Sequence, residues 1–159
     1  SGRDGILNIE RETKQSGPIH TKGVLTLNGY IGERYAKEKP LGVTIGLGFE
    51  QSYSYIEGDS ASCAELYAIL SALSGYPIKQ SIAITGSMNQ KGRVQPIGGV
   101  NEKIEGFFRL CKEIGFTGEQ GVIIPKSNVK NLILKDEVVE KVREGKFNIY
   151  AIEDVKDNV

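Results

Sequence analysis

The chain has 159 residues and equal numbers of basic and acidic side chains, twenty of each. This length predicts one domain over residues 1–159, and the balanced charge gives no reason to expect nucleic acid or an anionic membrane as a partner. Hydrophobic residues make up 39% and charged residues 25% of the chain, which excludes extensive disorder. No apolar run approaches the ~20 residues that span a bilayer, and no signal peptide opens the chain, so we expect a cytoplasmic protein.

The first third of the chain is expected to consist mainly of strands. Residues 5–12 alternate apolar and polar side chains, which predicts an edge strand. Residues 17–36 contain a predicted strand at 24–27, followed by a short helix or a turn. Residues 41–50 place apolar side chains at every second position, which predicts a strand with one buried face.

Helices and strands alternate in the remainder. Residues 60–74 contain one charged residue, Glu65, and are followed by Gly75, which predicts a buried helix. We also expect strands at 82–85, 121–125 and 148–152, a polar hairpin-like region at 86–94, an amphipathic helix at 101–114, and one or two charged helices at 128–144. The whole pattern predicts an α+β fold with a mixed β-sheet and packed helices.

Several common kinds of site are nearly excluded. His20 is the only histidine, so Ser-His-Asp and Cys-His arrangements are disfavoured, and we assign His20 no role. Cys63 and Cys111 lie in apolar stretches and are expected to be buried and reduced, with no disulfide framework and no metal site. Residues 86–93 do not have the residue order of a phosphate-binding loop, so we expect no cofactor in this chain.

A serine activated by a lysine remains. Gly58, Asp59 and Ser60 fall where a polar loop meets the predicted buried helix. A serine hydroxyl there lies at a helix N-terminus, where free N–H groups and the helix dipole stabilise a developing oxyanion. The alternative is that these residues simply cap the helix, with Ser62 and Glu65 as a capping box, and capping is the commoner use of such a pattern.

Lys103 is the candidate partner of the serine. On a helix that turns ~100° per residue, Ile104, Phe108 and Cys111 share one face, and Lys103 falls at the margin of that face. A lysine at such a margin either extends into water, which is the commoner case, or lies in a partly dry site. A dry site is what a catalytic lysine requires, because desolvation disfavours the charged form of an amine.

Four motifs, in this order, carry a family resemblance: GDSAS at 58–62, TGS at 85–87, VQPIGGVNEKIE at 94–105 and VIIPKSN at 122–128. Together they resemble the proteolytic domain of Lon proteases, with coverage over about residues 17–155. The form EGDSAS looks like the LonB-type branch. The combination of GPIHTKGVL, FEQSYSYIEGDSAS and GGVNEKIEGFF looks most like a bacterial LonB-like subgroup. The resemblance implies the fold of that domain, which is similar to domain 2 of ribosomal protein S5.

The resemblance also implies a Ser-Lys dyad. Ser60 would be the nucleophile, and Lys103 would be the general base and then the general acid. Thr85 matches a threonine that helps to position the lysine amine. Glu57 and Asp59 match supporting acidic positions, and a contact between Asp59 and Lys103 would keep the amine charged and mark a resting state.

The segment around the serine carries the remaining candidates. The backbone N–H groups of Gly58 and Ala61 are candidate oxyanion donors. The strand that contains Phe49, Glu50 and Gln51 is either an internal strand or a template on which an extended substrate adds as a further strand.

For the whole protein the resemblance implies an ATP-dependent serine endopeptidase acting on unfolded or damaged proteins and peptides. We expect a homo-oligomer in the form of a hexameric ring, and an AAA+ ATPase module, outside this chain, that binds ATP and Mg²⁺. Such domains begin with another strand upstream of residue 5, so we expect this chain to be trimmed at its N-terminus. Two alternatives stay open: a catalytically idle Lon-like domain for assembly or substrate binding, and a small-molecule-binding domain with an anion site at residues 86–93.

Overall fold

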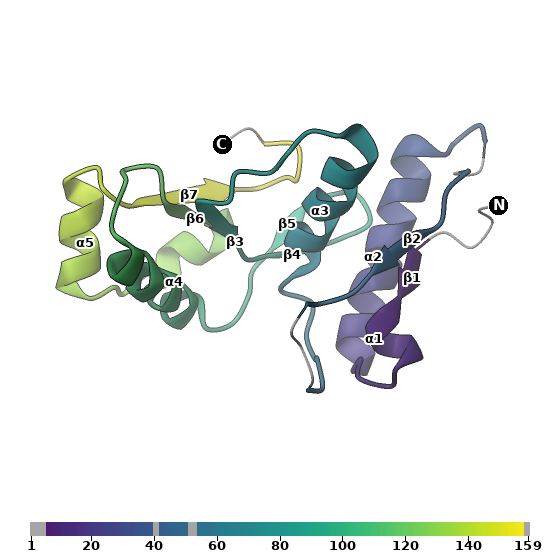
Figure 1. Cartoon of the computed structure of the whole chain (residues 1–159), viewed down its shortest axis with the longest axis horizontal. Coiled ribbons are helices and arrows are strands. Elements are labelled where there is room, and N and C mark those ends of the chain that lie inside the picture. The colour runs from purple at the N-terminus through teal and green to yellow at the C-terminus, as the bar shows by residue number, and fades with distance from the viewer. Residues whose placement is uncertain (1–5, 40–41, 51–53, 158–159) are drawn as a thin grey trace.

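The computed structural model describes residues 6–39, 42–50 and 54–157. It is elongated, and its elements form two groups that lie side by side (Figure 1). The first half holds β1 (Ile6–Asn8), α1 (Ile9–Glu12), α2 (Pro18–Tyr35), β2 (Ile45–Leu47) and α3 (Ser62–Ser74). The second half holds β3 (Ile82–Ile84), α4 (Val100–Ile114), β6 (Gly121–Pro125), the 3-10 helix η1 (Lys126–Asn131), α5 (Asp136–Arg143) and β7 (Asn148–Ile152). The short strands β4 (Ser87–Met88) and β5 (Val94–Gln95) connect the two halves.

Each half has its own buried apolar core. The core of the first half joins α2, α3 and β4 through Leu27, Tyr30, Ile31, Cys63, Leu66, Ile69, Met88 and Val155. The core of the second half joins α4, β6 and α5 through Val100, Ile104, Phe108, Cys111, Val122, Ile124, Val138 and Phe147. The site described below depends on how these two packed units meet.

The strands form three small sheets. β3, β6 and β7 pair in parallel in that order, and β1 pairs in parallel with β2. β4 and β5 pair antiparallel as the predicted hairpin. The α+β class is confirmed, with parallel and antiparallel pairing divided between separate sheets.

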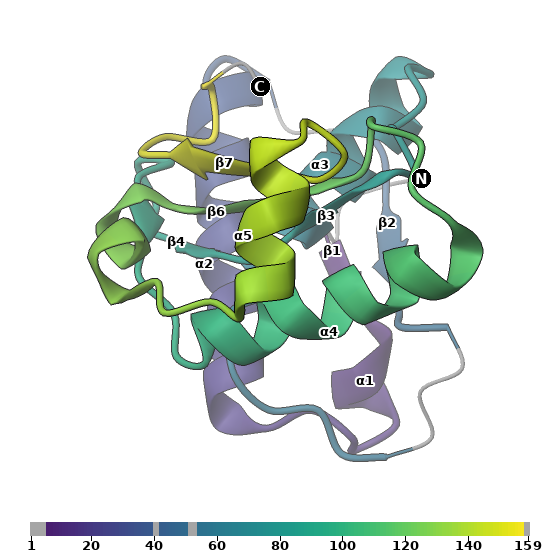
Figure 2. The ribbon, with the colours of Figure 1, turned by 90° about the vertical axis from the view of Figure 1, so that its left-hand side faces the viewer.

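The three-stranded sheet is covered differently on its two faces. Val122 and Ile124 of β6 belong to the core formed with α4 and α5. Figure 2 shows these two helices in front of the sheet. Between Val122 and Ile124 in the sequence, Ile123 points to the opposite face, where it lines an apolar cavity of about 850 Å³ beside α3. One helical layer and the flank of α3 therefore hold this sheet in place.

The prediction of a strand at 24–27 is wrong, because these residues lie in the middle of α2. The buried residues of α2 are His20, Gly23, Val24, Leu27, Tyr30 and Ile31. Their spacing is that of one helix face, and it extends over a longer window than the four residues that were predicted to form a strand. Pro18 at the first helical position also favours a helix start there.

Two other predicted strands are shorter than expected. Within residues 5–12 only β1 is a strand, and the chain then turns into α1, whose first turn is capped by the Asn8 side chain. Within residues 41–50 only β2 pairs, as a three-residue strand beside β1. The remaining predicted helices and strands are confirmed within a few residues. Among the described residues, no helix is both long and apolar enough to cross a membrane.

Phe108 offers a test of the core of the second half. Its side chain is 1% exposed, and its ring lies 5.2 Å from the Phe116 ring and 5.3 Å from the Phe147 ring, measured between centroids. We expect Phe108→Ala to lower the free energy of unfolding by about 3–5 kcal/mol, because it leaves a cavity. Arg109, the neighbouring exposed residue, provides the control. Arg109→Ala should change the free energy of unfolding by less than about 0.5 kcal/mol. Urea titration measures both, and similar values for the two variants would contradict this description of the core.

Candidate active site

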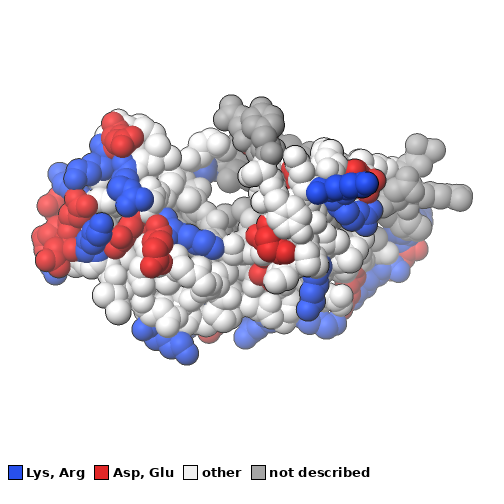
Figure 3. Space-filling model, turned by 90° about the horizontal axis from the view of Figure 1, so that it is seen from below, with Lys and Arg blue, Asp and Glu red and all other residues white. Residues whose placement is uncertain are grey.

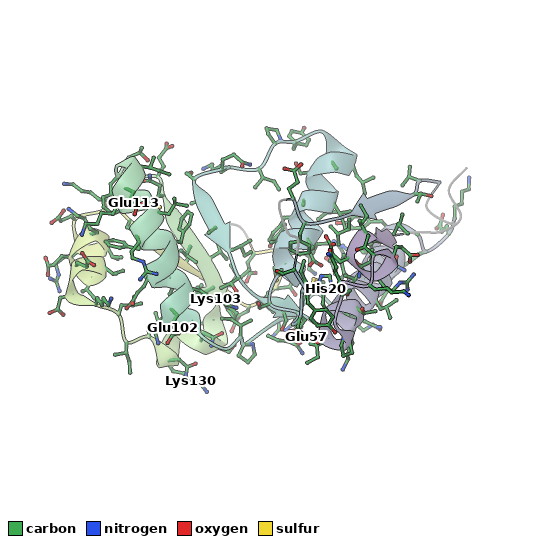
Figure 4. All side chains as sticks on the ribbon, turned by 60° about the horizontal axis from the view of Figure 1, so that its bottom comes forward. His20, Glu57, Glu102, Lys103, Glu113 and Lys130 are labelled. Carbon is green, nitrogen blue, oxygen red and sulfur yellow. The ribbon has the colours of Figure 1, made fainter. Side chains whose placement is uncertain are left out.

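Ser60 and Lys103 come from different halves of the molecule and meet at their side chains. The Lys103 amine donates a hydrogen bond to the Ser60 hydroxyl over 2.9 Å, although the residues are 43 positions apart in the chain. Ser60 lies two residues before α3, and Lys103 lies in the first turn of α4. Figure 4 shows Lys103 on the side of α4 that faces the first half, with Glu57 and His20 across from it.

Backbone hydrogen bonds fix the serine in place. The Gly86 N–H donates to the Ser60 carbonyl over 2.8 Å, and the Cys63 N–H donates to the Gly86 carbonyl over 3.1 Å. Thr85 continues the link into the second half, because its N–H donates to the Ile123 carbonyl over 3.1 Å. The segment between β3 and β4 thus ties the serine turn to the three-stranded sheet.

Thr85 is buried beside the serine. Its hydroxyl donates to the Ser60 carbonyl over 3.5 Å, so it contacts the backbone of the nucleophile candidate. Its role as a group that positions the Lys103 amine stays a prediction.

The expectation of a partly dry site for Lys103 is wrong for this chain by itself, because the residue is exposed. Lys103 lies in the first turn of α4, next to Glu102, which is exposed as well. On the face seen in Figure 3, a hollow separates the two halves, with charged side chains of both signs on either side.

The start of α3 is free of side-chain capping. Its N-cap residue is Ala61, and no side chain bonds to the first turn from that position. The predicted capping box is wrong: the Ser62 hydroxyl donates to the Asp59 carbonyl over 2.7 Å, and Glu65 bonds to His20 instead. The Ala61 N–H has no hydrogen-bond acceptor among the described residues, so it stays a candidate oxyanion donor.

Glu57 binds the loop before the serine to the start of α2. Its carboxylate accepts hydrogen bonds from the N–H groups of Gly58 (2.7 Å), Ile19 (3.0 Å) and His20 (3.0 Å). These bonds, that of Gly58 above all, hold the pKa of Glu57 below its usual value. Because Glu57 occupies the Gly58 N–H, this group is not available as an oxyanion donor in this arrangement.

Asp59 lies against α2. A side-chain carbon added at Gly23 would lie 3.1 Å from the Asp59 Cβ, which shows how closely the helix approaches the serine turn. Within the described part of the chain, Asp59 forms no ion pair with Lys103. The structure therefore differs from the predicted resting state, and its lysine contacts the serine.

The substrate-template candidates are placed only in part. Phe49 and Glu50 follow β2, and Gln51 lies outside the described residues. The Phe49 N–H donates to the buried Glu10 carboxylate over 2.6 Å, so it cannot also bond to an added strand. The template role stays a prediction for the backbone groups that Glu10 leaves free. Sequence reasoning missed Glu10, because nothing in its local pattern distinguishes it from an exposed acid.

The other sites weighed from the sequence gain no support. Cys63 and Cys111 are confirmed as free and buried, and burial raises the pKa of Cys63 to about 12, which disfavours a thiolate nucleophile. The described residues contain no cluster of three potential metal ligands. In the hairpin, Asn89 Oδ1 accepts from the N–H groups of Lys91 and Arg93, so this side chain already occupies two donors of the suggested anion site.

The Ser60 hydroxyl thus lies just before α3, within hydrogen-bond reach of the Lys103 amine. The chain belongs to the Lon protease (S16) C-terminal proteolytic domain family, whose profile matches residues 54–159. This confirms the resemblance that the four sequence motifs carry.

The chain is similar to bacterial and archaeal Lon-type proteins. It is 51% identical to a Lon protease homolog of Escherichia coli (strain K12) over 156 residues, which are 98% of this chain and 27% of that protein. It is 44% identical to a Lon protease homolog of Haemophilus influenzae, over 97% of this chain and 26% of that protein. It is 36% identical to the archaeal Lon protease of Thermococcus kodakarensis, over 90% of this chain and 20% of that protein. The chain thus spans about a quarter of the length of these relatives.

The lowered pKa of Glu57 predicts a pH-dependent contribution to stability. Its carboxylate stabilises the fold fully above its ordinary pKa of about 4.3, and this contribution is lost as the pH falls through the lower pKa of the folded state. We expect Glu57→Gln to destabilise the protein at pH 7, and the difference from wild type to shrink by pH 3. Urea unfolding at both pH values measures it. Glu113→Gln on α4 is the control and should show no such trend, and a pH-independent effect of Glu57→Gln would contradict the prediction.

Proposed function

We propose that this chain is a serine endopeptidase domain that hydrolyses peptide bonds with Ser60 as nucleophile and Lys103 as general base. One observation carries the proposal: the 2.9 Å contact between the Lys103 amine and the Ser60 hydroxyl at the start of α3. Membership of the Lon proteolytic domain family supports it. The distance lies within the range needed for proton transfer between a base and its nucleophile.

The reaction would take place in two stages. A neutral Lys103 amine takes the proton of the Ser60 hydroxyl as its oxygen attacks the scissile carbonyl carbon. The Ala61 N–H and the N-terminus of α3 stabilise the oxyanion. The lysine ammonium then gives its proton to the leaving amine, which breaks the peptide bond and leaves an ester on Ser60. A water molecule, deprotonated by Lys103, hydrolyses that ester and restores the serine.

The exposure of Lys103 sets a condition on this mechanism. A lysine amine in water is protonated at neutral pH and cannot accept a proton. We propose that a peptide bound between the two halves, or neighbouring parts of an assembled protein, excludes water from the amine. Activity should therefore depend on assembly or on substrates long enough to cover the hollow.

The proposal extends to the whole protein. The chain would be the proteolytic part of an ATP-dependent, cytoplasmic Lon-like protease that forms a hexameric ring and degrades unfolded or damaged proteins. A separate AAA+ module would bind ATP and Mg²⁺ and deliver the substrates. The alternative, a catalytically idle Lon-like domain for assembly or substrate binding, lacks a specific observation in its favour, because the contact between Ser60 and Lys103 is intact.

Substitution of the two proposed catalytic residues tests the function. We expect Ser60→Ala and Lys103→Met each to lower cleavage of a fluorescence-quenched peptide mixture by at least about a thousandfold, because either change removes the same proton-transfer unit. Lys112→Ala is the matched control, since Lys112 is an exposed lysine of the same helix that pairs with Glu137, and it should cleave at the wild-type rate. Equal rates in all variants would support the idle domain instead.

Asp59→Ala gives a second result with a clear direction. If contact of Asp59 with Lys103 keeps the amine charged in a resting state, removal of the carboxylate should preserve or raise peptide cleavage. The same assay measures the effect, with Asp59→Asn as a variant that keeps the size of the side chain. A complete loss of cleavage in both variants, with an unchanged unfolding midpoint, would show that Asp59 takes part in the reaction.

A further inference from the structure

His20 is a buried polar residue that the proposed chemistry does not use. The residue is 2% exposed, so its ring cannot contact a substrate. It nevertheless contacts three segments that surround the serine, and Figure 4 shows it close to Glu57 beside the start of α2.

The first contact is with the loop that carries the serine. The His20 N–H donates to Glu57 Oε1 over 3.0 Å, and the Gly58 N–H donates to the same oxygen over 2.7 Å. In the same place the Gly17 N–H donates to the Ile56 carbonyl over 2.7 Å. These bonds thus join the first turn of α2 to residues 56–58, the loop that precedes Ser60.

The second contact is with the helix that follows the serine. His20 Nε2 lies 3.2 Å from Glu65 Oε1, and the two side chains are 3% and 5% exposed. The Glu65 N–H in turn donates to the Ala61 carbonyl over 2.9 Å in the first turn of α3. A shift of Glu65 would therefore move Ala61, whose N–H is the oxyanion donor in the proposed mechanism.

The third contact is with the segment after β2. The rings of His20 and Phe49 pack in an edge-to-face arrangement, with centroids 5.5 Å apart and the ring planes at 67°. The other ring nitrogen, Nδ1, lies 2.8 Å from the Ser16 hydroxyl. The imidazole is thereby held by the Phe49 ring and by a separate hydrogen-bond partner at each of its two nitrogens.

We infer that His20 is a positioning residue for the site: it holds the serine loop, the first turn of α3 and the segment after β2 in one arrangement. This inference rests on the proposed function, because it concerns the placement of Ser60 and of the Ala61 N–H. His20 transfers no proton in the reaction.

Glu65 explains why the histidine is needed at this point. Its Oε2 atom is buried and has no hydrogen-bond partner among the described residues, so His20 provides its only side-chain bond there. Burial raises the pKa of Glu65, and His20 opposes that effect. Without the imidazole, the carboxylate would be buried and uncompensated, which favours movement of the first turn of α3 toward water.

Three substitutions of His20 separate its contacts. His20→Ala removes them all, except the backbone bond to Glu57. His20→Gln places an amide N–H near the position of Nε2 and keeps the bond to Glu65, whereas His20→Asn places it near Nδ1 and keeps only the bond to Ser16. Gln120→Ala is the control, because Gln120 is 7% exposed and bonds to the Gly115 carbonyl (2.9 Å) and the Thr117 N–H (2.8 Å) in the segment between α4 and β6.

The measurements are kcat and KM for peptide cleavage as a function of pH, and hydrogen exchange of the amides at 56–65. We expect His20→Ala and His20→Asn to lower kcat at least about tenfold and to speed this exchange, while His20→Gln stays within about threefold of wild type. The shape of the pH profile should be the same in all folded variants. Gln120→Ala should destabilise the protein without either effect.

The outcomes separate this inference from the proposed function. Wild-type kcat and exchange in His20→Asn would overturn it, and so would a His20→Gln variant as damaged as His20→Asn. Loss of one limb of the pH profile in His20→Gln would make His20 a proton carrier and would also overturn it. If wild type and Ser60→Ala cleave alike, the proposed function fails, and the exchange rates alone still decide whether His20 holds the serine turn. If His20→Ala does not fold, the comparison of Gln with Asn decides.

Discussion

The contact between Lys103 and Ser60 is the interaction on which the proposed site depends, and it crosses the boundary between two separately packed halves. Ser60 is placed by the core of α2 and α3, and Lys103 is placed by the core of α4 and β6. Their side chains are 2.9 Å apart because the segment between β3 and β4 bonds to the serine turn on one side and to β6 on the other. Rigid placement of both groups is what a proton transfer requires, since small displacements cost much of the rate.

Ser60 and Lys103 differ in how strongly the surrounding structure fixes them. The serine turn is bonded to Gly86, rests against Gly23 of α2 and is preceded by the Glu57 carboxylate with its three N–H donors. Lys103 projects from an exposed helix start next to two glycines. This asymmetry suits a site in which the nucleophile is preorganised and the base becomes competent only when water is excluded. Activity would then be coupled to substrate binding or assembly.

Three buried polar residues of the first half contact segments next to the serine turn. His20, Glu65 and Glu10 are each at most 5% exposed, and each bonds to a segment next to the site. Burial of such groups costs free energy unless their partners are in place, so they favour one arrangement of the loop and the helix over alternatives. These three residues therefore stabilise the backbone arrangement around Ser60.

The sequence by itself determined the class of fold, the buried helix after Ser60, the amphipathic helix that carries Lys103, and the family, because apolar periodicity and short motifs are local properties of the chain. It misplaced the strand at 24–27, because this short apolar segment was interpreted by itself, whereas the helical period becomes clear over the whole buried face of α2. The tertiary structure alone decided which groups meet: that Glu65 pairs with His20 rather than capping α3, that Glu57 occupies the Gly58 N–H, and that Lys103 is exposed. The pairing of Glu65 with His20 and the bonds from Glu57 to α2 join residues about 40 positions apart. No local pattern encodes the burial and the hydrogen-bond competition that settle such contacts.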